Sequence, residues 1–168
     1  LFAYSRFSSF GSMRVIGNLL RDNAYWGIAA IGMTFVIISG GIDLSVGSNM
    51  YLSAVCAGML MRSTGMEVLP AMFVSLAVGT IFGAVNAFAI VRLKIIPFMV
   101  TLATLVIGRG IGTAITQSQQ IDFPEKMNAF GQIAILGIPM PIIAFVILVA
   151  VAYFILTRTA FGRQLYAI

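Results

Sequence analysis

Histidine is absent from the 168-residue chain, and cysteine occurs once. Without histidine the chain lacks the commonest metal ligand and acid–base catalyst. The single Cys56 lies inside an apolar run, so cysteine can supply no disulfide framework, zinc site or redox pair. We therefore expect no metal site and no cofactor on this chain, and these absences argue against a histidine-based enzyme.

Charge is scarce as well. Only 9% of the residues are charged and 60% are hydrophobic, whereas soluble domains carry about 25% charged residues. The mean hydropathy is +1.04. Because one span needs about 20 apolar residues, we predict an all-α bundle of about five membrane-spanning helices, in a single domain over residues 1–168. The ten basic residues are spread over many loops, which is typical of topology signals rather than of a nucleic-acid surface.

A phosphate-cradling loop is also missing, since no G-x-x-x-x-G-K-[ST] occurs. If ATP drives this protein, another polypeptide must bind it. The ionisable candidates within the predicted spans are Asp43 and Arg109. Catalysis usually depends on paired titratable groups, so an intramembrane enzyme is poorly supported.

One stretch interrupts the apolar pattern. Residues 32–48 read GMTFVIISGGIDLSVGS, so an apolar run ends at Gly40-Gly41 and is followed by Asp43 and Ser45. A broken helix leaves backbone groups unpaired, which lipid tolerates only where protein or a water-filled cavity covers them. Such breaks recur at transport sites. The alternative is a tight turn between two spans, with Asp43 or Ser45 capping the second helix, and the residues alone leave both interpretations open.

The same stretch resembles the signature of the permease subunits of bacterial ATP-driven (ABC) sugar importers of the ribose, galactose and galactofuranose group. That group writes G-M-T-x-V-I-[IL]-[ST]-G-G-I-D-L-S-V-G-S at this point. The matching signature residues are Gly40, Gly41, Asp43, Ser45, Gly47 and Ser48.

Two further blocks carry the resemblance. Residues 94–110 are similar to the family's K-[IV]-x-[AP]-F-[IM]-x-T-L block, which ends in Arg-Gly, although Pro97 stands one place later than in some members. Residues 158–168 resemble R-T-x-[FY]-G-R-x-[LV]-Y-A-[IT], the lead-in to the helix that docks on the ATPase. Its matching residues are Arg158, Gly162, Arg163 and Tyr166. Residues 14–24 are close to the galactofuranose-type branch.

The resemblance implies a non-catalytic permease subunit in the bacterial inner membrane. Its expected partners are a cytoplasmic ATP-binding subunit, a sugar-binding protein outside the cell, a second permease subunit and the surrounding bilayer, with no nucleic acid. Because the sequence opens at Leu1 rather than at a Met, we expect a first span to be missing. The resemblance implies that more spans follow Ile168.

Orientation also comes from the resemblance. Counting loop charges gives five on one side (Arg6, Arg14, Arg21, Arg62 and Lys126) and four on the other (Arg92, Lys94, Arg158 and Arg163), which decides nothing. The resemblance places the second group in the cytoplasm and residues 117–138 outside.

Several side chains are candidates to line a solute path. Ser39, Thr101 and Thr104 could offer neutral hydroxyls, as could the signature serines, but ordinary helix packing also explains each of them. Arg109 stands within an apolar span, where an arginine must face protein or water; alternatively, it reaches toward the nearby polar loop. Asn86 is expected to form an interhelical hydrogen bond rather than to contact solute.

The remaining pattern predicts the elements. Residues 12–23 are amphipathic and favour a separate interfacial helix, although they could be the first turns of the next span. Five spans are predicted. The first covers residues 24–39, the second runs from the glycine break to residue 61, and the third covers residues 68–91. The fourth begins at Pro97, the fifth runs from Pro139 to residue 157, and a long polar loop at 117–138 separates these two. A stripe of small residues, Gly79, Gly83 and Ala87, predicts close helix packing.

Two other functions stay open at this point. A proton- or sodium-driven secondary carrier would also suit a broken helix with an acidic residue. Proton relays, however, normally place chains of Asp, Glu or His in the spans, and only Asp43 is present here. A structural subunit without a path of its own is the third possibility.

Overall fold

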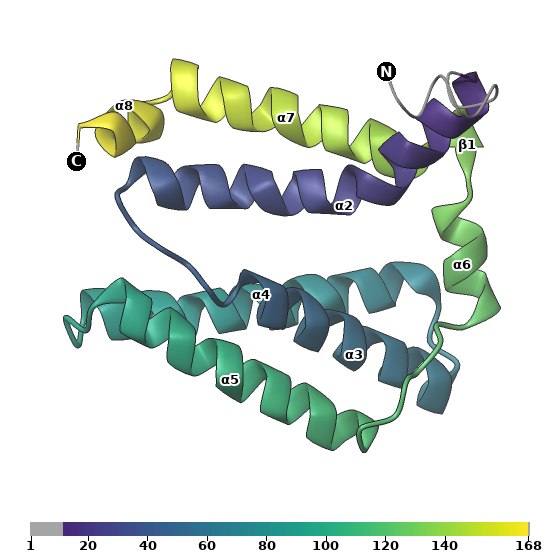
Figure 1. The fold of residues 1–168 in the computed structure, drawn as a ribbon, viewed down its shortest axis with the longest axis horizontal. Coiled ribbons are helices and arrows are strands. Elements are labelled where there is room, and N and C mark those ends of the chain that lie inside the picture. Colours follow the sequence, from purple (N-terminus) through teal and green to yellow (C-terminus); the bar gives the residue numbers. More distant parts are fainter. Residues whose placement is uncertain (1–11, 168) are drawn as a thin grey trace, which may run out of the picture. The chain divides into compact units, whose positions relative to one another are not determined.

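The computed structural model describes residues 12–167; Arg6, counted above among the loop charges, lies outside the described residues. Long helices make up most of the described chain (Figure 1): α2 (Met13–Ile38), α3 (Val46–Thr64), α4 (Val68–Val91), α5 (Pro97–Thr116) and α7 (Met140–Arg158). The shorter elements are α6 (Glu125–Gly131), α8 (Ala160–Tyr166) and an antiparallel ribbon of β1 (Ala134–Ile135) and β2 (Ile138–Pro139). The predicted all-α fold class is confirmed.

The chain divides into two compact units. Residues 40–130 form one unit, in which α3 packs against both α4 and α5. The described residues up to Ser39, together with those from Gly131 onward, form the other unit, in which α2 lies along α7 (Figure 1). All the contacts described below lie within one unit or the other.

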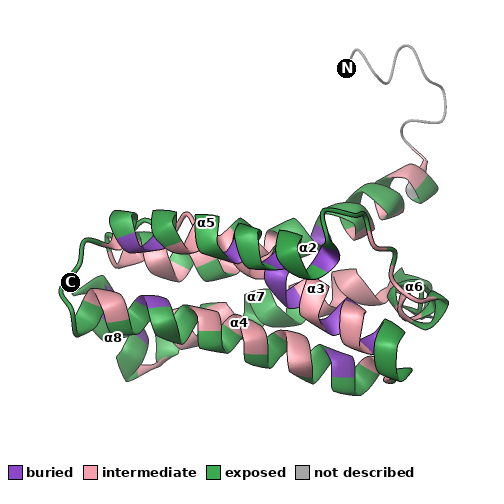
Figure 2. Ribbon diagram, turned by 90° about the horizontal axis from the view of Figure 1, so that it is seen from below, coloured by how far each residue is buried: buried purple, intermediate pink, exposed green. Residues whose placement is uncertain are grey.

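Three helices are long and apolar enough to cross a membrane, namely α4, α5 and α7. Most of their apolar side chains are exposed on the surface, where contact with water would be unfavourable. The described part of α7 has no buried residue, and α4 buries only Ala71 and Asn86 (Figure 2). A helix that is hydrophobic all round belongs in a membrane or a large core, so these surfaces suit lipid or further helices.

The helix boundaries follow local sequence signals. The polar turn after α3 closes at Gly65, whose φ of 70° is left-handed, as glycine allows. Helix α5 begins at Pro97, where a missing N–H removes no helical hydrogen bond. Helix α4 has the predicted bounds of 68–91.

Two expectations were wrong. Residues 12–23 do not form a separate interfacial helix, because α2 runs unbroken from Met13 to Ile38, with Ser12 capping its start. No proline lies between Met13 and Ile38 to interrupt the helix. The polar segment at 117–138 is not one loop either, since it contains α6 and the first strand of the ribbon.

The core of the 40–130 unit is small. Ala57 and Met61 of α3 pack on Ala71 of α4, with partly buried side chains around them. An exposed ion pair between Lys126 and Glu67 joins the start of α6 to the start of α4. Exposed pairs contribute about 0–1 kcal/mol, so the packing of α3 between α4 and α5 is the main support of this unit.

Candidate functional site: a polar network at the helix break

The break lies where the glycine pair predicted it. Helix α2 ends at Ile38, and Ser39 follows as its C-cap. Gly40 then adopts a φ of +72°, a left-handed conformation that side chains with a Cβ disfavour. Helix α3 begins only at Val46, so residues 39–45 leave the helical path.

Asp43 organises the residues just before α3. Its Oδ1 accepts hydrogen bonds from the backbone N–H of Ser45, at 2.7 Å, and from the Ser45 hydroxyl, at 2.6 Å. A carboxylate in this position also lies close to the positive end of the α3 dipole. Ser45 is the N-cap residue of α3, but its own side chain makes no capping bond. Asp43 therefore fixes the turn into α3.

Side chains from α4 and α5 complete the network. Asn86 of α4 donates from Nδ2 to the Ser45 hydroxyl oxygen at 2.9 Å, and Thr101 of α5 donates to the carbonyl oxygen of Ile42 at 3.3 Å. Asn86 and Thr101 are buried, and Ser45 is only 1% exposed. Protein groups therefore cover part of the backbone that the break exposes, as a bilayer requires.

Asn86 has one polar atom left over. Within the described residues its Oδ1 has no hydrogen-bond partner. The amide cannot simply be turned around, because the Ser45 hydroxyl already donates to Asp43 and so offers Asn86 a lone pair rather than a proton. The geometry agrees with helix-to-helix bonding by Asn86.

Close packing beneath the break depends on two glycines of α5. A Cβ on Gly108 would lie 3.2 Å from Cβ of Ser48 and 3.0 Å from the Phe82 ring, and one on Gly112 would lie 2.9 Å from Cδ1 of Tyr51. Gly79 of α4 similarly approaches α3, since a Cβ on Gly79 would lie 3.4 Å from Oγ of Ser53. Small residues thus let α5 and α4 approach α3 closely.

Of the hydroxyls predicted to line a path, those of Ser39, Thr101 and Thr104 each bond to a backbone carbonyl of their own helix. Ser39 donates to the carbonyl of Val36 at 2.8 Å, and Thr104 donates to Val100 at 3.0 Å. Thr101 bonds to Phe98 as well as to Ile42. These bonds account for the hydroxyls without any solute, and a lining role for them stays a prediction.

Arg109 lies on α5 between Gly108, which is buried, and Gly110, which is exposed, and its own side chain is exposed in this unit. The two ion pairs in the described part of the chain, Arg21 with Asp22 and Lys126 with Glu67, do not involve it. Because Gly108 faces α3, Arg109 points away from the packed side of α5. Its role also stays a prediction.

The residues predicted to lead into a coupling region lie around a tight turn between α7 and α8. Thr159 is the N-cap of α8: its Oγ1 accepts from the Gly162 N–H at 3.2 Å and donates to the Ile155 carbonyl. Gly162 is buried against the backbone of α7, while Arg158, Arg163 and Tyr166 are exposed. A role for these exposed side chains in coupling stays a prediction.

The described residues hold no cluster of three or more His, Cys, Asp or Glu side chains that could bind a metal ion. The site is a helix break at which neutral side chains and one carboxylate form hydrogen bonds to the non-helical backbone and to one another. A family model described as the permease component of branched-chain amino acid transport systems matches residues 15–168.

The chain belongs to this permease family. It is 38% identical over its whole length to the inner membrane ABC transporter permease protein YjfF of Escherichia coli, covering 52% of that protein. It is 40% identical to the ribose import permease RbsC of Bacillus subtilis, over 90% of the chain and 48% of the relative. It is also 36% identical to the fructose import permease FruF of Bifidobacterium longum, over 89% of the chain and 43% of that relative.

These relatives confirm the resemblance to sugar-import permeases that residues 32–48 carry. The chain spans about half the length of the curated relatives it matches. No solved structure matches it.

Sequence reasoning missed two parts of this site. It named the stripe at Gly79 but not the equivalent Gly108-x-x-x-Gly112 of α5, although that spacing is a readable signal. It also did not identify the bonds that tie Asn86 to Ser45 and Thr101 to Ile42, residues 41 and 59 positions apart. No local pattern reveals such long-range partners.

Proposed function

We propose that this chain is part of the permease subunit of an ATP-driven sugar importer in the bacterial inner membrane, within a single permease domain. The observation that carries the proposal is the broken helix of the signature, whose polar residues bond to one another within the 40–130 unit. The family match and the names of the relatives support it.

In this mechanism the permease carries out no chemistry. A sugar-binding protein delivers solute, and ATP is bound and hydrolysed by a separate cytoplasmic subunit. This chain and a second permease subunit then open alternately to the two sides. An uncharged solute needs only neutral hydrogen-bonding groups along its path, which is consistent with spans of so few ionisable side chains.

Rigid packing around the break also fits this role. In alternating access, groups of helices move against one another as rigid bodies. Such movement requires that the two halves of a broken helix keep their structure. The Asp43–Ser45–Asn86 bonds hold the start of α3 to α4. The turn at Thr159 and Gly162 would lead from α7 to the region that receives the movement of the ATPase.

Two alternatives are tested by the same experiment. An ion-coupled carrier would normally place several acidic side chains in its spans, whereas the helix break carries only Asp43, whose Oδ1 accepts two hydrogen bonds from Ser45. The family description names branched-chain amino acids, whereas the similar proteins that name a solute include ribose and fructose importers.

The test is uptake into proteoliposomes that hold the full-length permease and its ATPase, with an ionophore present. We expect labelled sugar to accumulate only when ATP and the sugar-binding protein are supplied together, and labelled leucine not to accumulate. Uptake that ATP does not change and the ionophore abolishes would identify an ion-coupled carrier. Uptake of leucine in place of sugar would reject the substrate class.

A further inference from the structure

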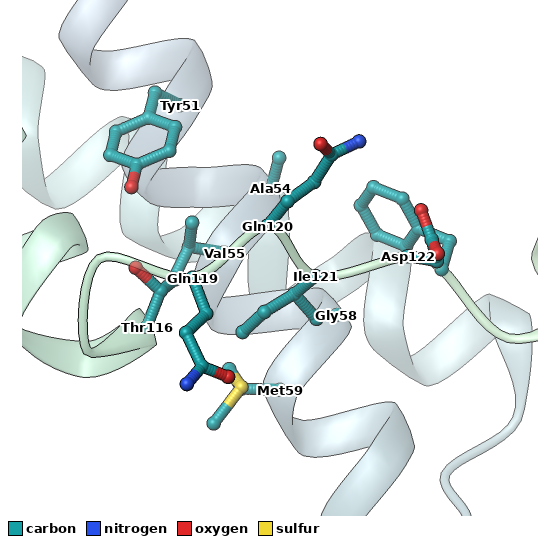
Figure 3. Close-up of a pocket in the computed structure, with 11 residues that line it drawn as sticks. Tyr51, Ala54, Val55, Gly58, Met59, Thr116, Gln119, Gln120, Ile121 and Asp122 are labelled. Atoms are coloured by element: carbon teal, nitrogen blue, oxygen red, sulfur yellow. The ribbon is translucent and has the colours of Figure 1, made fainter.

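A cavity of about 240 Å³ lies within the 40–130 unit, between α3 and the segment that follows α5 (Figure 3). One wall comes from α3, including Tyr51, Ala54 and Gly58. The other comes from Thr116 and residues 119–123. Figure 3 shows the segment passing directly over the α3 side chains.

The end of α5 builds the near side of this cavity. Gln117 and Ser118 have φ values of 54° and 61°, which cost non-glycine residues about 1–2 kcal/mol each. The turn is closed by bonds from Ser118 N–H to the Thr113 carbonyl and from Gln119 N–H to the Thr116 carbonyl, each 3.0 Å. Such left-handed residues cluster at binding sites.

The far side is anchored by Phe123. Its ring lies so close to Gly58 that a Cβ there would be 3.0 Å from the ring, and its carbonyl accepts from the Asn128 amide at 3.4 Å. The segment is therefore held at both ends. The cavity is a formed feature of the unit rather than a gap beneath a loose loop.

The polar residues around the cavity, Tyr51, Gln119, Gln120 and Asp122, are exposed, so a ligand can reach them. Within the described residues, the Tyr51 hydroxyl, the Gln119 and Gln120 amides and the Asp122 carboxylate make none of the side-chain hydrogen bonds found. Side chains at the break behave differently, since Asp43, Ser45, Asn86 and Thr101 all bond to protein. At the break, Oδ1 of Asn86 is the buried side-chain atom left without a partner, so more of the unbonded polar side chains lie at the cavity than at the break.

The chemistry of the lining selects the ligand. Amides and a hydroxyl both donate and accept hydrogen bonds, a carboxylate accepts from hydroxyls, and apolar side chains can cover the C–H face of a ring. Arginine and lysine are absent from the described lining, so a free amino acid would find no cation for its carboxylate. The cavity volume of about 240 Å³ is below the range of about 300–1,000 Å³ typical of sites for drug-sized ligands, so the cavity suits a smaller molecule.

We propose that this cavity binds a monosaccharide. The proposal rests on the proposed function, because the sugar is the solute the importer carries. It adds a site on the permease itself, formed by α3 and residues 116–123, that holds sugar without the binding protein.

The test is binding of monosaccharides to full-length permease in lipid nanodiscs, without ATPase or binding protein. Saturation-transfer NMR would be titrated with ribose, fructose and galactose, and with leucine as a comparison. Ala54→Leu should abolish the signal by filling the cavity. Tyr51→Phe should weaken binding about five-fold, the equivalent of one hydrogen bond.

Matched controls are Ala77→Leu on an exposed face of α4 and Tyr153→Phe on α7, neither of which lines the cavity. Both should bind sugar as the wild type does. ATP-dependent uptake by the complete transporter is measured in parallel and tests the proposed function separately.

Absence of a sugar signal in the wild type, with uptake intact, would overturn the cavity proposal alone. An equal signal in Ala54→Leu and wild type would place the sugar elsewhere and overturn it as well. Uptake that is sensitive to Ala54→Leu without any sugar signal would assign the cavity to a docking protein and would also overturn it.

Discussion

Replacing Gly162 with alanine should disrupt the connection between α7 and α8. A Cβ at this position would lie 2.5 Å from the carbonyl carbon of Leu156 and 2.6 Å from the carbonyl oxygen of Ile155, and would overlap the Leu156 oxygen. These are backbone atoms, which cannot rotate away as a side chain does. Overpacking typically costs about 1–3 kcal/mol, occasionally more, and we expect the upper end or beyond.

The measurement is thermal unfolding of the full-length permease in detergent, together with ATP-dependent uptake by the complete transporter. Gly162→Ala should lower the unfolding midpoint and remove most uptake, because the turn leads into the region proposed to contact the ATPase. Gly17→Ala is the control: that helical position has nothing within 4 Å of a Cβ, and alanine favours a helix by about 1 kcal/mol. Equal behaviour of the two variants would contradict the packing described for Gly162.

Asp43→Ala should have the second largest effect. It leaves the Ser45 N–H without an acceptor and removes the acceptor of the Ser45 hydroxyl, in a residue that is 1% exposed. Each buried unsatisfied group costs about 1–3 kcal/mol. We expect a clear loss of thermal stability and of uptake, since the start of α3 would no longer be fixed.

Two further variants should have smaller effects than Asp43→Ala. Asp43→Asn keeps an oxygen that can accept both bonds, so its effect should be smaller than that of Asp43→Ala. Ser53→Ala removes only one bond of 3.4 Å to Asn49 and should be the mildest of the three. Wild-type uptake and stability in Asp43→Ala would remove Asp43 from the mechanism.

Local signals in the sequence predicted the parts of the fold that depend on near neighbours. Pro97 marks the start of α5, and Gly40 marks the break because a left-handed φ is needed there. The amphipathic pattern at 12–23 misled for a physical reason. Periodicity shows which face is polar but not where a helix ends, and no proline between Met13 and Ile38 interrupts α2.

The candidate site was predictable only in part. The signature located Asp43 and Ser45, but the contact of Ser45 with Asn86 depends on how α3 and α4 pack, which no local pattern specifies. The hydroxyl of Thr104 illustrates the opposite case. Serine and threonine in helices commonly bond to a carbonyl one turn earlier, so its bond to Val100 could have been anticipated.

The cavity was not predicted at all. Its walls join α3 to a segment more than fifty residues later in the chain. The sequence indicated a long polar stretch after α5, but the left-handed turn at Gln117 and Ser118 brings that stretch back over α3. A polar stretch by itself does not reveal such a reversal.

The most direct test of the polar network is a double-mutant cycle between Ser45 and Asn86. The free energy of unfolding of the full-length permease would be measured for Ser45→Ala, Asn86→Ala and the double variant, by denaturant titration in detergent. We predict a coupling energy of about 1 kcal/mol or more, the size expected of a buried hydrogen bond. The control cycle pairs Ser45 with Thr80, an exposed residue bonded to its own helix, and should be additive within about 0.5 kcal/mol. Additivity between Ser45 and Asn86 as well would contradict the claim that α4 holds the broken helix in place.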